Sequence, residues 1–157
     1  MAKASLQIKG IEELKRKLQE RKEIFVKALG TQLAQLGEQC ITYSKDNKGY
    51  KDRTANLKNS ISYALYLDGE LVTSVIGQLP KPDDAKQGQH GVQSALENFA
   101  QQGNVAPSGY TIIVVAGMEY GKYVEDKGYN VLHLTKYYLR DEMEKIFKEV
   151  VERIREQ

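Results

Sequence analysis

The residues best able to do chemistry in this sequence are one cysteine and two histidines, Cys40, His90 and His133. A thiol beside an imidazole is the arrangement of a cysteine nucleophile, because the imidazole can remove the thiol proton. The same residue types bind zinc when three or four of them stand at short, regular spacings. Neither histidine has a cysteine or an aspartate at such a spacing, so the sequence does not predict a metal site.

Cys40 falls on the apolar face of a predicted helix, where a free cysteine behaves as a small hydrophobic side chain. As the chain's single cysteine, it also excludes an internal disulfide. An enzyme built around Cys40 and a histidine is therefore the weakest of three functional hypotheses. We expect no catalytic residue, no cofactor and no metal.

Phosphate binding is a second kind of chemistry, suggested by four basic residues that stand close together: Lys45, Lys48, Lys51 and Arg53. They favour the alternative hypothesis of a small nucleic-acid-binding module that uses the basic N-terminal half. The interleaved Asp46 and Asp52 argue against it. Residues 1–60 have 13 basic against 7 acidic residues and residues 61–157 have 10 against 14, so the charge changes from +6 to −4 along the chain. This asymmetry is a basis for head-to-tail association between copies.

The elements that would position these residues predict an α+β fold in one domain, residues 1–157. A small antiparallel β-sheet is flanked by a long N-terminal helix and a C-terminal amphipathic helix, and no run of residues is long and apolar enough to span a membrane. Apolar residues at three- and four-residue steps predict helical structure from Ile11 to about Ser44, with one face that includes Leu14, Leu18 and Phe25. Two glycines inside this run are compatible with one helix that has a weak point or with two abutting helices. A second helix follows Leu132.

Four further segments complete the predicted fold. Asp68-Gly69 between two alternating runs predicts a hairpin, and the unbroken apolar run at 110–117 predicts a central strand that the C-terminal helix covers. A short strand is predicted at 5–9. Residues 78–108 form a long inserted loop with a short helix.

The segment "DRTANLKNSI" (52–61) has the polar composition of a turn that leads into a strand. Thr54 is the predicted N-cap of a single helical turn, with Leu57 as its apolar anchor and either Asn59 or Ser60 at its end.

Three segments, in this order, resemble a family of tail-completion or head–tail joining proteins of long-tailed bacteriophages. They are "IKGIEELKRKL" (8–18), "DRTANLKNSI" (52–61) and "VVAGMEYGKYVEDKGYNVL" (114–132). The matching positions of the last two, which we take as structural and interface candidates, are Arg53, Thr54, Leu57, Ser60, Tyr120, Tyr123 and Glu125; Ile61 and Val124 also match, as do Gly10, Ile11 and Leu14 in the first.

The resemblance implies a structural virion protein without catalytic activity, a minor tail component that forms a homo-oligomeric ring, commonly of six copies. Its partners would be the phage head connector and the tail-tube proteins, with DNA passing only through the lumen. It would reside in the virion neck, and in the host bacterial cytoplasm during assembly.

Two departures from the family pattern suggest a divergent, prophage-encoded branch. Ala55 stands where the family often has glycine, so we expect a helical rather than a left-handed turn there. The segment "DKGYNVL" replaces the usual sequence before the last helix. Residues 78–108 lie outside the resemblance. Either they dock weakly on the sheet or, as we expect, they become ordered against a neighbouring subunit or the connector.

Overall fold

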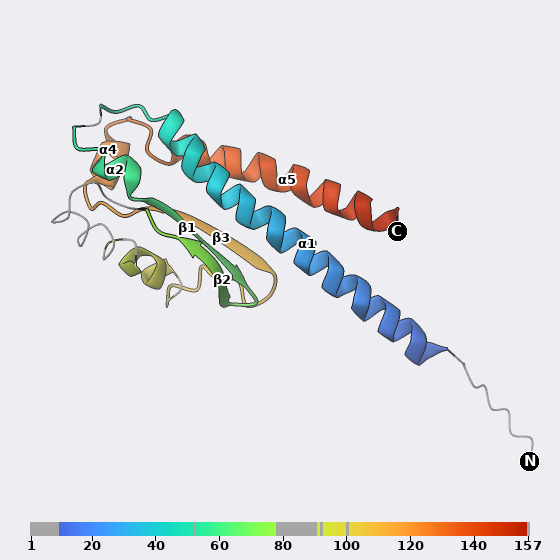
Figure 1. Cartoon of the computed structure of the whole chain (residues 1–157). Coiled ribbons are helices and arrows are strands. Elements are labelled where there is room, and N and C mark those ends of the chain that lie inside the picture. The colour runs from blue at the N-terminus through green and yellow to red at the C-terminus, as the bar shows by residue number, and fades with distance from the viewer. Residues whose placement is uncertain (1–9, 52, 78–90, 92, 100, 157) are drawn as a thin grey trace, which may run out of the picture.

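The structure is a computed structural model of the 157-residue chain, and it describes residues 10–51, 53–77, 91, 93–99 and 101–156. The elements, in chain order, are α1 (Ile11–Asp46), α2 (Asn56–Asn59), β1 (Ile61–Leu67), β2 (Glu70–Val75), β3 (Tyr110–Ala116), α4 (Gly121–Asp126) and α5 (His133–Arg155). Figure 1 shows two long helices beside one small sheet, which confirms the predicted α+β fold. The strand predicted at 5–9 and most of the first half of 78–108 lie outside the described residues.

The sheet is antiparallel throughout, in the order β2-β1-β3. The predicted hairpin is confirmed, because Asp68 and Gly69 join β1 to β2 and both have positive φ, 52° and 85°, as the tightest hairpin turns require. Asp68 also ties the start of β3 to this turn: its carboxylate accepts a hydrogen bond from the Gly109 N–H at 2.7 Å.

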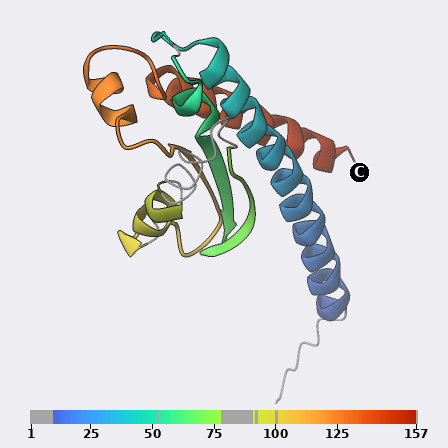
Figure 2. The same ribbon diagram turned by 60° about the vertical axis from the view of Figure 1, so that its left-hand side comes forward.

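The prediction that residues 110–117 form the central strand is wrong, because β1 is central and β3 lies at an edge. The apolar run in β3 instead reflects burial on both faces. Ile112 and Val114 pack against the core under α1. Ile113 and Val115 pack on the other side, against a group that includes Ala95 and Leu96. Figure 2 shows the sheet between α1 and the short helix around 93–99. The helical spacing of apolar residues in that segment predicted the helix.

Two glycines allow α1 to approach the sheet closely. A methyl group on Gly37 would collide with the ring of Tyr63 in β1, and one on Gly30 would collide with the hydroxyl of Tyr110 in β3. That hydroxyl donates a hydrogen bond to the Val26 carbonyl at 2.8 Å. The glycines weaken the helix by about 1 kcal/mol each relative to alanine, and in return two sheet tyrosines pack against its backbone. α1 is nevertheless one continuous helix.

The C-terminal helix packs mainly along α1, so the expectation that it covers the sheet is corrected: α1 is the main cover. The rings of Tyr43 and Tyr138 stack with centroids 4.2 Å apart, and the hydroxyl oxygens of Ser44 and Thr135 lie 2.7 Å apart in the buried interface. Leu139 and Ile146 of α5 then complete the core beneath α1. No helix in the described part of the chain is long and apolar enough to cross a membrane.

The first turns of α1 extend away from this core (Figure 1). Ile11, Leu14 and Leu18, predicted to belong to the buried face, are 41%, 58% and 59% exposed. The periodicity predicted the apolar stripe correctly, but no described element covers it.

Candidate functional site

The turn before β1 differs from its predicted form. Thr54 is not the N-cap: that position is Ala55, which adopts a left-handed conformation with φ 59°. The expectation of a helical rather than left-handed turn at Ala55 is therefore wrong. The Thr54 hydroxyl instead lies 3.4 Å from the Asn56 N–H, a long contact that supports the turn from one residue further back. A non-glycine residue pays a steric cost in this conformation, so α2 begins under local strain.

Leu57 is the apolar anchor that the sequence predicted, and it is 4% exposed. It packs on the first residue of α4, because a Cβ on Gly121 would lie 3.1 Å from the Leu57 side chain. Ser60 is buried and directs the backbone into β1: its hydroxyl donates to the Leu57 carbonyl at 2.8 Å, and its carbonyl accepts from the Gly117 N–H at 3.2 Å. These contacts bring two sequence segments, about sixty residues apart, to one end of the sheet.

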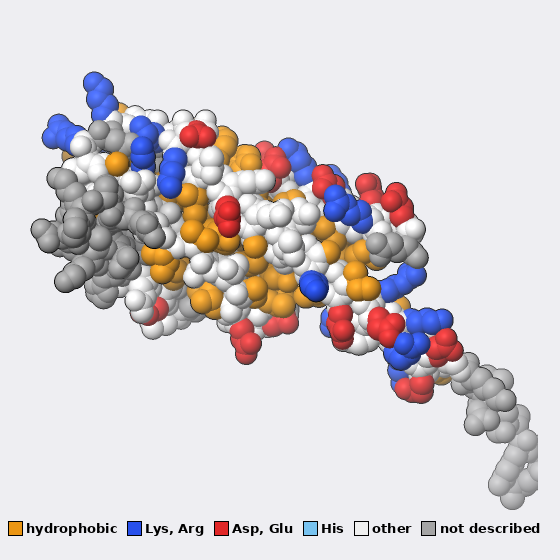
Figure 3. Space-filling view, in the orientation of Figure 1, with side chains coloured by type: hydrophobic (Ala, Val, Ile, Leu, Met, Phe, Trp, Pro, Cys, Tyr) orange, Lys and Arg blue, Asp and Glu red, His pale blue; other side chains and the backbone are white. Residues whose placement is uncertain are grey.

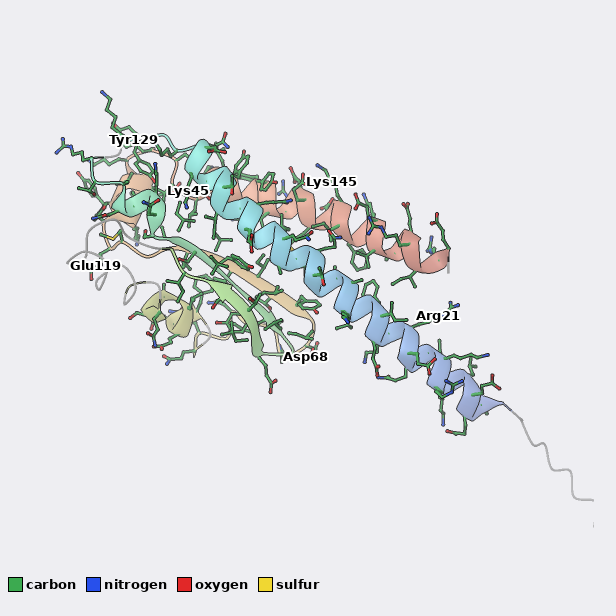
Figure 4. All side chains as sticks on the ribbon, viewed as in Figure 1. Arg21, Lys45, Asp68, Glu119, Tyr129 and Lys145 are labelled. Carbon is green, nitrogen blue, oxygen red and sulfur yellow. The ribbon has the colours of Figure 1, made fainter. Side chains whose placement is uncertain are left out.

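A cavity of about 470 Å³ lies where these segments meet. Leu57 and Val124 supply apolar lining, and Arg53, Thr54 and Tyr120 line it with them. Of the predicted site residues, the structure therefore brings Arg53, Thr54, Leu57 and Tyr120 together. Figure 4 shows Glu119, which also lines the cavity, at the end of the molecule away from the free end of α1.

The cavity combines apolar lining with charged and aromatic groups. Arg53 is exposed, as is Lys51 beside it, and Tyr120 is 43% exposed. Glu119 is the one carboxylate among the described lining residues, which include no histidine or cysteine. This arrangement can bind a mixed apolar and acidic protein segment, because tyrosine and arginine are the residue types enriched at such interfaces.

Glu125, predicted as a structural or interface candidate, caps a helix within the chain. Its carboxylate accepts hydrogen bonds from the backbone N–H groups of Val131, Leu132 and His133 at 3.0, 2.7 and 3.1 Å. These are N–H groups at the start of α5, which have no partner within the helix. A carboxylate there also interacts favourably with the helix dipole. Glu125 thereby fixes α4 to α5.

Asn130 adds a second link that sequence reasoning missed. Its side-chain oxygen accepts from the Leu134 N–H at 2.9 Å, and its side-chain nitrogen donates to the Asn47 carbonyl at 2.6 Å. The end of α1 and the start of α5 are thus held together through one residue. An asparagine just before a helix was the available signal. Sequence reasoning also missed Gly121, whose role in the site is its close contact with the Leu57 side chain.

Tyr123, the last predicted site residue, lies outside the cavity lining. It is 64% exposed, and the Lys127 ammonium lies 5.3 Å from its ring centroid. Tyr120 and Tyr123 therefore belong to the same short motif but face different surroundings.

The candidate chemistry at Cys40 finds no support in its surroundings. The side chain is fully buried, and burial, with a smaller contribution from the negative charge of Glu142, raises the pKa of the thiol to about 12. A thiol of that pKa is protonated at neutral pH and is a poor nucleophile. His133 is exposed and packs edge-on against Tyr137; His90 lies outside the described residues. Within the described ranges, no three His, Cys, Asp or Glu residues are grouped to hold a metal ion.

Comparisons of this chain with protein-family models, with curated proteins and with solved structures found no match.

Proposed function

We propose that this chain is a structural virion protein of a long-tailed phage or prophage, a ring-forming head–tail joining or tail-completion component. The observation that carries the proposal is the meeting of two motifs at one cavity. Arg53, Thr54 and Leu57 come from the first motif and Tyr120 and Val124 from the second, and all five line the same space. Segments that resemble one family separately are here parts of one structural unit.

The cavity suits a protein partner better than a small metabolite. Its rim has exposed basic and aromatic side chains, Lys51, Arg53 and Tyr120, and its lining includes the apolar Leu57. A tyrosine provides a large apolar surface with a polar tip, which favours contact with another protein. The head connector and the tail-tube proteins are the partners that the proposal assigns to this end of the molecule.

The decisive experiment removes the gene from the phage that encodes the chain and examines the lysate by electron microscopy. We expect DNA-filled heads and separate tails, with joined virions restored by a plasmid copy of the gene. Normal virions from the deletion strain would contradict the proposal.

Complementation with single variants tests the cavity itself. Tyr120→Ala and Arg53→Glu change exposed rim residues, so both proteins should fold and yet reduce the yield of infectious particles by at least tenfold. Tyr123→Ala is the matched control, since Tyr123 is more exposed, belongs to the same motif and does not line the cavity. Equal yields from the Tyr120 and Tyr123 variants would exclude the cavity as a docking site.

One observation favours the alternative of nucleic-acid binding. Figure 3 shows Lys and Arg side chains gathered at the end of the molecule where α1 ends, and Figure 4 labels Lys45 there. Lys48 lies 5.8 Å from the centroid of the Tyr50 ring in the same loop. Fluorescence anisotropy with a labelled DNA duplex at 50 and 200 mM salt tests this alternative, because binding through several phosphates should fall at least a hundredfold over that range. Binding that is weak at both salt concentrations favours the structural role.

A further inference from the structure

The N-terminal turns of α1 form an apolar surface without a partner in the described chain. We call residues 11–22 the arm; it is about 18 Å long at 1.5 Å per residue. Its stripe of Ile11, Leu14 and Leu18 is about half exposed. The stripe continues to Phe25, where the core begins to cover it: the Phe25 ring packs edge-on against Phe147 of α5, with centroids 6.1 Å apart.

Charge is distributed unevenly around the arm. At about 100° per residue, four of the five basic residues of the arm, Lys15, Lys17, Arg21 and Lys22, lie within about 90° of the centre of the stripe. The fifth, Arg16, lies on the far side of the helix, where it pairs with Glu20. The acidic residues of this region, Glu12, Glu13, Glu20 and Glu23, lie more than about 120° away by the same geometry. The stripe is thus bordered by positive charge. Lys15 and Lys17 pair with Glu12 and Glu13 at 3.0 and 2.9 Å, but exposed pairs of this kind are weak and can be exchanged for others.

This border decides against pairing between two arms. Whether two arms lay parallel or antiparallel, the basic borders would face each other along the seam. Like charges at these flanking positions disfavour association. The arm requires an apolar surface that is bordered by acidic residues.

The hairpin provides such a surface. Four side chains of the hairpin are large, apolar and exposed: Leu71 57%, Val72 52%, Val75 37% and Ile76 46%. Val75 is paired with Tyr63 on the face toward α1, whereas Leu71 is paired with Tyr66 on the opposite face. We call Leu71, Val72 and Ile76, together with Asp68 and Glu70, the hairpin patch. Residues 61–77 contain two acidic residues and no basic one. β2 is also an edge strand of the sheet, and an exposed apolar edge strand is a surface that proteins normally cover. Figure 3 shows acidic groups beside hydrophobic side chains in this part of the molecule.

We propose that the arm of one copy docks on the hairpin patch of a second copy of this chain. Its stripe covers the apolar side chains of the hairpin patch on the face of the sheet that carries Leu71, and its basic border faces Asp68 and Glu70. Arg21 and Asp68 mark the two surfaces in Figure 4, on separate elements of one chain. Each contact leaves one arm and one hairpin patch free, so the contact repeats from copy to copy and closes into a ring if the rotation allows. The inference rests on the proposed function in taking the closed ring as the product.

Disulfide cross-linking between purified chains of two sizes tests the contact. Leu18→Cys is placed in a tagged chain and either Leu71→Cys or Val72→Cys in an untagged one; the native Cys40 is buried and does not interfere. An arm-to-hairpin contact gives the mixed dimer, arm pairing gives the tagged homodimer, and edge-to-edge pairing gives the untagged one. Glu20→Cys, on the far side of the arm, is the matched control.

We expect the mixed dimer to form at least fivefold faster than with the Glu20→Cys control, and to be the main product. A charge exchange sharpens the test, because Lys22→Glu should reduce cross-linking several-fold and Glu70→Lys in the partner chain should restore it. Lys22 and Glu70 are both exposed, so the Lys22→Glu and Glu70→Lys proteins should fold, which circular dichroism checks. A rate equal to the control, a dominant homodimer, or no rescue by the charge exchange would overturn the proposal.

The proposed virion role and the proposed contact between copies can each be refuted without refuting the other. If cross-linking fails while deletion of the gene still leaves heads and tails unjoined, the virion role stands and the subunits meet elsewhere. If the mixed dimer forms but the deletion strain makes normal virions, the contact stands and the ring has another use.

Discussion

Replacing Gly37 with alanine sets two opposed effects against each other at one position of α1. Alanine favours a helix over glycine by about 1 kcal/mol in a helix interior, so propensity alone predicts a more stable protein. The new methyl group, however, would overlap three atoms of the Tyr63 ring. Tyr63 is 2% exposed and belongs to the central strand, so the ring has no free space into which to move.

Overpacking of this kind costs about 1–3 kcal/mol, and more where the neighbours are fixed. We take about 3 kcal/mol for a methyl group against a ring that is held on both sides. The expected net loss is then about 2 kcal/mol in the free energy of unfolding, which in urea is a midpoint about 1 M lower. Urea unfolding followed by circular dichroism measures it.

Gly30→Ala is the matched control in the same helix. There the methyl group would meet only the outer end of the half-buried Tyr110 side chain, which can turn away at the cost of its hydrogen bond to Val26, so we expect a change within about 1 kcal/mol. Adding Tyr63→Leu to Gly37→Ala should recover about 1–2 kcal/mol relative to additive losses. A Gly37→Ala protein as stable as the wild type, or more stable, would refute the reasoning.

Three further predictions concern stability and reactivity. Glu125→Ala removes the acceptor of three N–H groups at the start of α5 and should lower the free energy of unfolding by about 2 kcal/mol, measured in urea. The control Asp126→Ala, at the exposed neighbouring residue, should lower it by less than about 0.5 kcal/mol. Equal losses would mean that the cap contributes nothing. Ala55→Gly should stabilise by about 0.5–1 kcal/mol because it relieves a left-handed alanine, while Ala34→Gly within α1 should lose about 1 kcal/mol; a loss at both positions would refute the strained turn. Cys40 should react with a thiol reagent at pH 8 at least a hundredfold more slowly in the folded than in the unfolded chain. Since its folded pKa is raised from 9.0 to about 12, the unfolded chain alone releases the proton above pH 9, so the advantage of wild type over Cys40→Ala should shrink as pH rises from 9 to 12. A constant difference, or rapid labelling of the folded chain, would mean that the thiol is accessible.

Local sequence signals predicted several local features, although not the turn before β1, where Ala55 rather than Thr54 is the N-cap and is left-handed. The Asp68-Gly69 turn, the periodicity of α1 and α5 and the apolar anchor Leu57 all depend on residues close in the chain, and all are confirmed. The strand order was not predictable in the same way. An unbroken apolar run such as β3 indicates burial on two faces, and the helix around 93–99 covers one face of an edge strand as effectively as a neighbouring strand would.

The candidate site was predicted in part for the same reason. Arg53, Thr54, Leu57 and Tyr120 were selected individually, yet their meeting at one cavity depends on the packing of Leu57 against Gly121. The capping role of Glu125 joins two helices across a loop, and a motif that marks the residue says nothing about its acceptor geometry. The left-handed conformation at Ala55 was not predictable from the residue type, because alanine seldom adopts it.

The arm shows where a periodic pattern ends as a source of structural information. An apolar stripe indicates that a helix face is removed from water, but it does not indicate whether the same chain or another chain covers that face. From Phe25 onward the chain itself supplies the cover, and before Leu18 the described chain does not. In β2, too, apolar side chains are exposed although the strand pattern predicts that some of them are buried. Sequence patterns that a monomer leaves unused are evidence about the assembled state, because a consistent sequence satisfies its apolar surfaces somewhere. The proposed docking of the arm on the hairpin patch would remove both surfaces from water and bring their opposite charges together.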